Sequence, residues 1–171
     1  MVEIRLEQPG DIEAVRDINE RAFGEPQEAE IVDSLRTTCK ELLSLVAVLN
    51  DRLIGCILFS PVTLDTPHGK IVGMGLAPMA VLPRFQRNGV GSVLVKRGLQ
   101  LLREQGCPYV IVLGHPEYYP RFGFVPASLK GLTCQWAGVP DESFMVKVFD
   151  EAAMPESGGE LRYMDEFDQT M

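Results

Sequence analysis

The sequence AVLPRFQRNGVG, residues 80–91, decides the fold. An apolar run ends at Leu82, a loop with two arginines follows, and Gly89 and Gly91 open a segment with apolar residues at helical spacing. This pattern predicts a strand, a glycine-bearing loop and the first turn of a helix. The first N–H groups of a helix have no intrahelical partner, and glycine lets an anion approach the backbone. We therefore expect a phosphate-bearing ligand at this turn.

Other glycine-containing motifs do not fit these residues. The dinucleotide fingerprint G-x-G-x-x-G fails because Leu94 stands where its third glycine would be. The P-loop ending G-K-[ST] fails because Ser92 and Val93 follow Gly91, and Leu94 also excludes a G-x-S-x-G hydrolase elbow. Alone, Q-x-x-G-x-G is a weak signal, which a plain strand–helix loop with flexible glycines would also produce.

Two helices and three strands are predicted before this loop. Apolar residues at steps of three and four predict a helix over residues 12–22, and a second helix begins near Pro26. Leu45–Leu49 and Leu53–Phe59 read as a hairpin, and Lys70–Leu82 as a longer strand. Pro78 lies inside that strand. Because proline has no N–H to donate, we expect Pro78 at an edge, at a bulge or where two strands part.

The elements after the loop make a crossover connection. Val90, Val93 and Leu94 begin a helix, for which Gly106 is a natural stop, and Tyr109–Leu113 is a compact apolar strand. A strand, a helix and a strand at this spacing predict parallel strands. Further downstream, residues 116–122 predict a short helix and 144–149 a last strand. The expected fold is therefore one α/β domain over residues 1–150, and we interpret residues 151–171 as an acidic extension packing on that domain.

Composition narrows the function classes. A chain of 171 residues with 46% hydrophobic residues suits one core, and the net charge of −8 argues against general nucleic-acid binding. Between Thr66 and Arg103 there is no Asp or Glu, but there are six Lys and Arg residues. This basic segment is either a binding site for a small polyanion or the solvated face of a helix.

The cysteines and the N-terminal sequence indicate which cellular compartment to expect. The four cysteines form no C-x-x-C pair, which indicates neither a zinc site nor a redox dithiol, and we expect no metal. The N-terminus has no basic start followed by an apolar run, so we expect no signal peptide. The sequence has no stretch of about 18 apolar residues, so we expect no membrane span. These features favour the cytoplasm. Cys56 or Cys107 as a nucleophile would need a partner base that the spacing does not supply.

The order of elements and three motifs resemble the GNAT (GCN5-related) N-acetyltransferase superfamily. These motifs are Q-x-x-G-x-G and the runs LFSPV, residues 58–62, and VLGHPEYYPRFGF, residues 112–124. The two runs are similar to YhbS-like predicted N-acetyltransferases. The resemblance extends from about Ile4 to Phe149 and includes the sequence GELRY near the end.

The resemblance implies acetyl-CoA as co-substrate and acyl transfer to a primary amine by direct attack. It implies a mixed, mostly antiparallel sheet in which the strand before the loop splays from a parallel neighbour, and pantetheine pairs with backbone groups of Met79, Ala80 and Val81. The matching phosphate residues are Gln86, Arg87, Asn88, Gly89, Val90, Gly91 and Ser92. Tyr119, four residues before a Gly-Phe pair, would be the general acid for the leaving thiolate; the alternative is that it packs the short helix.

Three points stay open. The base could be Glu28, Glu30, His115 or a chain of water molecules, and Glu28 could instead bind the acceptor. Outside the basic segment the chain has 24 acidic against 10 basic residues, which favours a cationic amine acceptor, although an acidic surface also aids solubility. Two functions other than acetyl transfer stay open: a non-catalytic acyl-CoA-binding module and a scaffold built on the acidic tail. Within acyl transfer, the donor could carry a longer acyl group. We expect a monomer or homodimer.

Overall fold

The structure is a computed structural model that describes residues 1–170. It divides into two compact units: the first holds residues 1–59 and 77–100, and the second holds residues 60–76 and 101–169. Three elements run through both units: strand β3 (Arg52–Thr66), strand β4 (Gly69–Val81) and helix α3 (Val90–Glu104). Each unit is described by itself.

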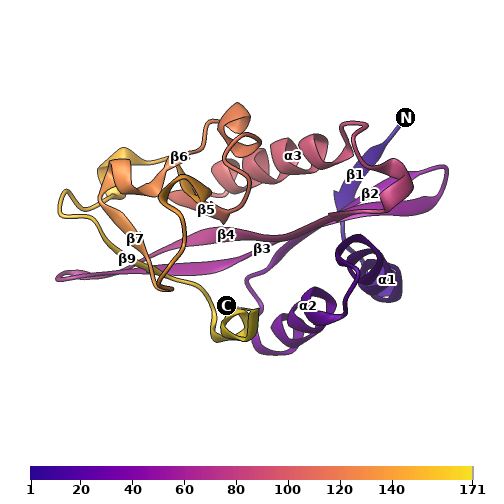
Figure 1. The fold of residues 1–171 in the computed structure, drawn as a ribbon, viewed down its shortest axis with the longest axis horizontal. Coiled ribbons are helices and arrows are strands. Elements are labelled where there is room, and N and C mark those ends of the chain that lie inside the picture. Colours follow the sequence, from indigo (N-terminus) through magenta and orange to yellow (C-terminus); the bar gives the residue numbers. More distant parts are fainter. Residues whose placement is uncertain (171) are drawn as a thin grey trace. The chain divides into compact units, whose positions relative to one another are not determined.

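The first unit is an antiparallel sheet with helices on both faces. Strand β1 pairs with β2, and β2 pairs with the beginning of β3. In Figure 1, helices α1 and α2 lie on one face of these strands and α3 lies on the other. The remaining elements of this unit are β1 (Glu3–Leu6), α1 (Ile12–Phe23), α2 (Gln27–Thr38) and β2 (Leu43–Leu49).

Two glycines allow α3 to approach the sheet closely. A Cβ on Gly98 would come within 2.4 Å of the Phe59 ring, and a Cβ on Gly55 would come within 3.3 Å of Val90 and Leu94. Any side chain at Gly98 would therefore push the helix away from the strand. Val93, which the spacing predicted to lie on the apolar face, is instead exposed, and the buried residues of this part of α3 are Val90, Leu94 and Val95.

The second unit contains the parallel pair that the crossover predicted. Strand β4 pairs in parallel with β5 (Tyr109–Leu113), in register from Met74↔Val110 to Leu76↔Val112. Strand β5 continues antiparallel to β8 (Phe144–Val148), which pairs with β6 (Val125–Pro126). The fold is therefore the expected mixed α/β sheet, mostly antiparallel with a parallel pair.

The C-terminal segment adds a strand to this sheet. Strand β9 (Gly159–Arg162) pairs antiparallel with the end of β3 and in parallel with β7 (Leu132–Cys134). Neither β7 nor β9 was predicted from the sequence. Strand β3 is also longer than predicted: it continues past Pro61 to Thr66, because Val62 and Leu64 stay buried in alternation.

Pro78 lies where the sequence led us to expect it. The register of β4 with β5 ends at Leu76, two residues before Pro78, and the Ala77–Pro78 peptide bond is cis. Beyond this point, in the first unit, β4 stays bonded to β3, because the N–H of Leu82 donates to the Ile54 carbonyl at 2.8 Å. Pro78 therefore coincides with the end of the parallel ladder.

Candidate active site

The loop before α3 has the backbone conformation of an open helix start. Arg87 and Gly89 have positive φ angles of 64° and 85°, and the helix begins at Val90. The N–H of Val93 donates to the Gly89 carbonyl at 3.1 Å, which is the first bond of the helix. The N–H groups that precede Val93 lie ahead of the intrahelical ladder, so they and the helix dipole present partial positive charge at this turn.

The polar side chains of this loop hold the loop itself. Gln86 donates through Nε2 to the Val81 carbonyl at 2.9 Å, and Asn88 donates through Nδ2 to the Gln86 carbonyl at 3.2 Å. Their amides are therefore engaged with the turn. The side chains of residues 86–88 are exposed, and Gly89 has open space around its missing Cβ. The part of the loop free to meet an anion is its backbone.

The last residues of β4 offer alternate backbone groups. Because the N–H of Leu82 points to β3, the backbone groups of Ala80 point the same way, and those of Met79 and Val81 point away from β3. Of the three residues that the resemblance implied, Met79 and Val81 therefore have the orientation needed to pair with an extended ligand. The Val81 carbonyl already accepts the hydrogen bond from Gln86.

Arg84 contributes its charge to a separate hollow of the first unit. With Arg21 and Arg52 it lines a pocket of about 390 Å³ beside Leu82 and Pro83. Its guanidinium also lies 5.1 Å from the centre of the Phe85 ring. The basic segment seen in the sequence is thus not confined to one helix face, since Arg84 precedes α3 and lines this pocket with Arg21 of α1 and Arg52 of β3.

Tyr119 is a buried phenol in the second unit. It begins a 3₁₀ turn, Tyr119–Phe122, that takes the place of the predicted short helix, and its ring meets Tyr118 edge-on at 5.1 Å between centroids. The ring also contacts Phe124, and it rests against Gly114, where a Cβ would come within 2.4 Å. Burial raises the pKa of Tyr119 to about 12. Tyr118 is half-buried and lies under the Arg121 guanidinium.

His115 and Tyr119 belong to one turn. The His115 carbonyl accepts from the N–H groups of Tyr118 at 3.1 Å and Tyr119 at 3.4 Å. The His115 side chain is exposed and lines a pocket of about 460 Å³, whose walls are residues 113–116, 137–140 and Ser143. This volume lies within the range of small-molecule pockets. The second unit therefore places a phenol and an imidazole on the same turn, next to a pocket.

Glu28 lies in the first turn of α2, in the first unit. It is half-buried, and its Oε2 atom is buried without a hydrogen-bond partner, whereas Glu30 is exposed. A buried carboxylate oxygen without a donor is costly, so a group that could donate to it is expected when ligands bind. The predicted site residues thus fall into two sets: residues 79–92 and Glu28 in the first unit, and His115 and Tyr119 in the second.

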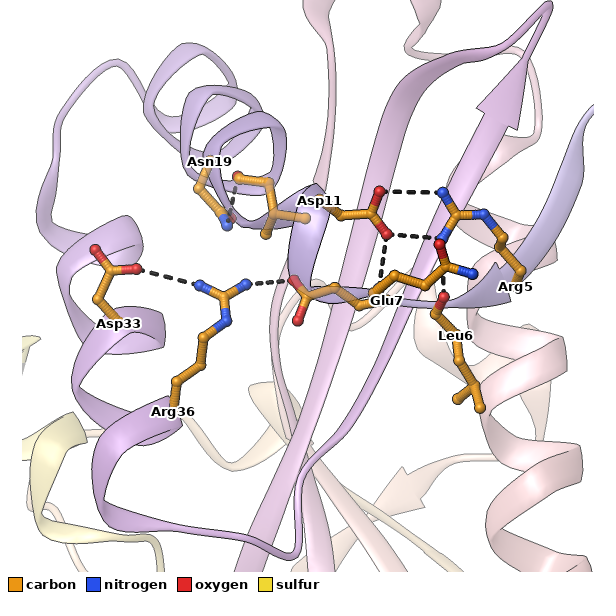
Figure 2. A network of polar contacts seen from close by, with 9 residues as sticks. Arg5, Leu6, Glu7, Asp11, Asn19, Asp33 and Arg36 are labelled. Carbon is orange, nitrogen blue, oxygen red and sulfur yellow. Dashed lines mark hydrogen bonds and ion pairs between the residues drawn. The ribbon is translucent and has the colours of Figure 1, made fainter.

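Ion pairs join α2 to the segment that follows β1, and β1 to the turn before α1 (Figure 2). Arg36 of α2 donates to the carboxylates of Glu7 and Asp33, and the Arg36 and Glu7 side chains are only 16% and 13% exposed. A second pair joins Arg5 to Asp11, with 2.7 Å between Nη1 and Oδ2. The hydrogen bond from Arg5 holds the pKa of Asp11 below its ordinary value. This network fixes the helix that carries Glu28.

A family model described as an acetyltransferase (GNAT) domain matches residues 3–127. The chain belongs to the GNAT acetyltransferase family. The match takes in the loop before α3, β5 and Tyr119. The resemblance drawn from the motifs is therefore confirmed, and so is the enzyme class that it implied.

Relatives and solved structures of GNAT proteins agree over most of the chain. The uncharacterised N-acetyltransferase YjhQ of Escherichia coli K12 is 40% identical over 139 residues, 77% of this chain and 74% of YjhQ. The crystal structure of YhbS from Escherichia coli in complex with CoA is 33% identical with a TM-score of 0.89, covering 98% of this chain and 92% of that one. A GNAT family acetyltransferase from Brucella melitensis, in complex with acetyl-CoA, is 34% identical with a TM-score of 0.81, covering 98% and 99%.

Sequence reasoning missed Tyr163 as a residue of the second unit's interior. It follows β9 directly, is buried, and stacks on Trp136. The alternation in GELRY was the available signal, because it places Leu161 and Tyr163 on one side of a strand. Among residues 1–170, no helix is long and apolar enough to cross a membrane. Within that same span, no three His, Cys, Asp or Glu side chains gather to ligate a metal ion.

Proposed function

We propose that the chain transfers an acetyl group from acetyl-CoA to a primary amine by direct attack of the amine on the thioester. The helix start at Val90 is the observation that carries the proposal. A left-handed glycine, an exposed loop held by its own Gln86 and Asn88 side chains, and amides that lie ahead of the intrahelical ladder make a receptor for a doubly charged oxyanion. The diphosphate of CoA has that chemistry.

The residues present fit CoA along its length. The amides of residues 87–91, with Ser92 in the first turn of α3, would hold the diphosphate, and Arg87 adds positive charge. The backbone of Met79 and Val81 would pair with the amides of pantetheine. Support comes from YhbS and the Brucella melitensis protein, which were crystallised with CoA and acetyl-CoA.

Tyr119 would act as the general acid. The amine nitrogen bonds to the carbonyl carbon, the carbon–sulfur bond breaks, and the phenol gives its proton to the leaving thiolate. Because burial raises the pKa of Tyr119 to about 12, the phenol stays protonated at neutral pH and is available to donate. The amine loses its proton to a base, for which Glu28, His115 and a water chain remain the alternatives.

The acceptor would be a cationic amine. Two features support this: the excess of acidic residues outside the basic segment, and the Glu28 carboxylate oxygen that is buried without a donor. A polyamine, an aminoglycoside-like sugar, or a lysine or N-terminal amine all have this chemistry.

Two measurements test the proposal. Calorimetric titration with CoA should give binding that Gly91→Glu weakens more than 10-fold, because a carboxylate is placed at the anion site; Gln100→Glu puts the same charge near the other end of α3 and should not.

A screen of amines with acetyl-CoA should then show thiol release that Tyr119→Phe lowers while CoA affinity is kept. No CoA binding by the unaltered chain would refute the proposal. Turnover unchanged in Tyr119→Phe would remove the acid role, and CoA binding without turnover on any amine would favour a non-catalytic binding module.

A further inference from the structure

Three arginines of the first unit line one pocket. Arg21 lies in the last turn of α1, Arg52 opens β3, and Arg84 belongs to the 3₁₀ turn that follows β4. With Leu82 and Pro83 they line the hollow of about 390 Å³. Within residues 1–170, no Asp or Glu lines this pocket, although the chain has 24 acidic against 16 basic residues. Positive charge is therefore concentrated at one place on a negative protein.

The backbone brings Arg52 and Arg84 to the same end of two neighbouring strands. Strands β3 and β4 are adjacent in the sheet and are joined by a two-residue turn at residues 67–68, so they run antiparallel. The N–H of Leu82 donates to the Ile54 carbonyl at 2.8 Å, which fastens the end of β4 to the beginning of β3. Arg52 lies two residues before Ile54, and Arg84 lies two residues after Leu82. The fold therefore sets the two arginines together.

The three arginines differ in what else holds them. Arg21 pairs with Asp17 through Nε at 3.0 Å, and a positive charge is favourable in the last turn of a helix. Among residues 1–170, neither Arg52 nor Arg84 forms an ion pair. Like charges that converge repel one another, and an anion between them removes that repulsion. The pocket therefore has the electrostatics of an anion site.

The chemistry of the lining favours a phosphate group over a carboxylate. A guanidinium keeps its charge and presents N–H donors in a planar fork that matches phosphate oxygens. A phosphomonoester carries close to two negative charges and three acceptor oxygens, so it can engage three arginines at once. Leu82 and Pro83 add an apolar wall on which the carbon part of such a ligand can pack.

We propose that Arg21, Arg52 and Arg84 form a second anion site, which binds a phosphomonoester group. It differs from the diphosphate site of the proposed function, because residues 86–92, all of which the structure describes, do not line this pocket. Its lining comes in part from α1, which lies on the face of the strands opposite to α3 (Figure 1). Two sources supply the chemistry: the 3′-phosphate of bound CoA, which rests on the proposed function, and a separate phosphorylated small molecule, which does not.

The first test compares CoA with 3′-dephospho-CoA, which lacks the phosphomonoester. Arg52→Gln is the variant, because Arg52 belongs to β3 and not to the loop that precedes the diphosphate residues. Arg97→Gln is the matched control, since Arg97 is exposed on α3, bonds to Gln100 and lies outside the pocket. If CoA supplies the phosphate, calorimetry should show an affinity for CoA about 5-fold lower in Arg52→Gln, with the affinity for 3′-dephospho-CoA kept.

The second test uses inorganic phosphate as the probe, at about pH 8, where phosphate is mostly doubly charged. The chain is first saturated with 3′-dephospho-CoA, so that the diphosphate site is filled. Phosphate should bind the unaltered chain and Arg97→Gln alike, and about 5-fold more weakly to Arg52→Gln. Saturation with CoA then separates the sources: the 3′-phosphate of CoA should exclude inorganic phosphate, whereas a pocket for a separate ligand should still bind it.

The outcomes are distinct for the pocket and for the proposed function. If Arg52→Gln matches Arg97→Gln in every titration, the inference is overturned, and equal Tm values of the two variants would show that both are folded. If the unaltered chain binds neither CoA nor 3′-dephospho-CoA, the proposed function fails. Titration of the chain alone with inorganic phosphate would then still test the pocket, through the same pair of variants.

Discussion

The ring of Tyr119 rests directly on Gly114, the residue that follows β5: a Cβ at Gly114 would come within 2.4 Å of the ring. The orientation of Tyr119, the proposed acid, therefore depends on the absence of a side chain at Gly114. Phe124 contacts the ring with 5.8 Å between centroids, and the Tyr119 N–H donates to the His115 carbonyl, so the ring has little freedom to move aside.

Gly114→Ala is expected to displace the Tyr119 ring. We expect kcat to fall at least 10-fold while CoA affinity changes less than about 3-fold, and the unfolding free energy to drop by about 1–3 kcal/mol through overpacking. Steady-state kinetics, calorimetry and urea unfolding measure the three quantities. Gly10→Ala is the control, because a Cβ there meets nothing within 4 Å. Retained kcat in Gly114→Ala would show that the ring's position is not critical.

The Arg36 network should contribute measurably to stability. Arg36→Ala leaves Glu7, which is 13% exposed, without its partner, and we expect a loss of about 1–3 kcal/mol in urea unfolding. Arg21→Ala removes an ion pair whose side chains are 61% and 54% exposed, so its loss should stay below about 0.5 kcal/mol. Equal losses in the two variants would mean that the burial of the Glu7–Arg36 pair has no consequence.

The sequence was informative wherever contacts are local. Residues 109–113 were predicted as a strand and form β5, and residues 70–82 were predicted within one residue of β4. Both signals come from apolar runs flanked by turn residues. The loop at residues 86–91 was also readable, because a helix start needs only its own backbone to become an anion receptor.

Non-local pairing set the limits of the prediction. Strand β9 has four residues, and it exists because Thr63 and Leu64 of β3 lie beside it. No period in so short a segment specifies a partner 97 residues away, Leu161 being opposite Leu64. Since Tyr163 follows β9, its place over Gly75 was hidden for the same reason. The end of β3 was missed because Pro61 is ordinarily a strand breaker.

Asp11 should make stability depend on acid pH. The hydrogen bond from Arg5 lowers the pKa of Asp11 in the folded chain, so its contribution is complete above the unfolded pKa of about 3.9 and is lost as pH falls through the folded value. We expect the unfolding free energies of the unaltered chain and Asp11→Asn to differ at pH 7 and to converge below about pH 4. Asp17→Asn, at an exposed pair, should show little difference at any pH. A constant gap for Asp11→Asn from pH 7 to pH 3 would contradict the assignment.

Replacing Glu28 tests whether α2 binds the amine acceptor, and Glu30 of the same helix serves as the control. Glu28 has a buried carboxylate oxygen without a donor, whereas Glu30, two residues later, is exposed. If the carboxylate binds or deprotonates the amine, Glu28→Gln should lower kcat/KM for the amine at least 10-fold and leave CoA affinity unchanged. Glu30→Gln removes the same charge and should change kcat/KM less than about 2-fold, since exposed charges are screened. Stability separates this role from a structural one: replacing a carboxylate that has one buried oxygen without a donor should leave the unfolding free energy equal or higher. A Glu28→Gln variant that unfolds more easily yet keeps its kcat/KM would assign the carboxylate to the fold and return the base to His115 or water.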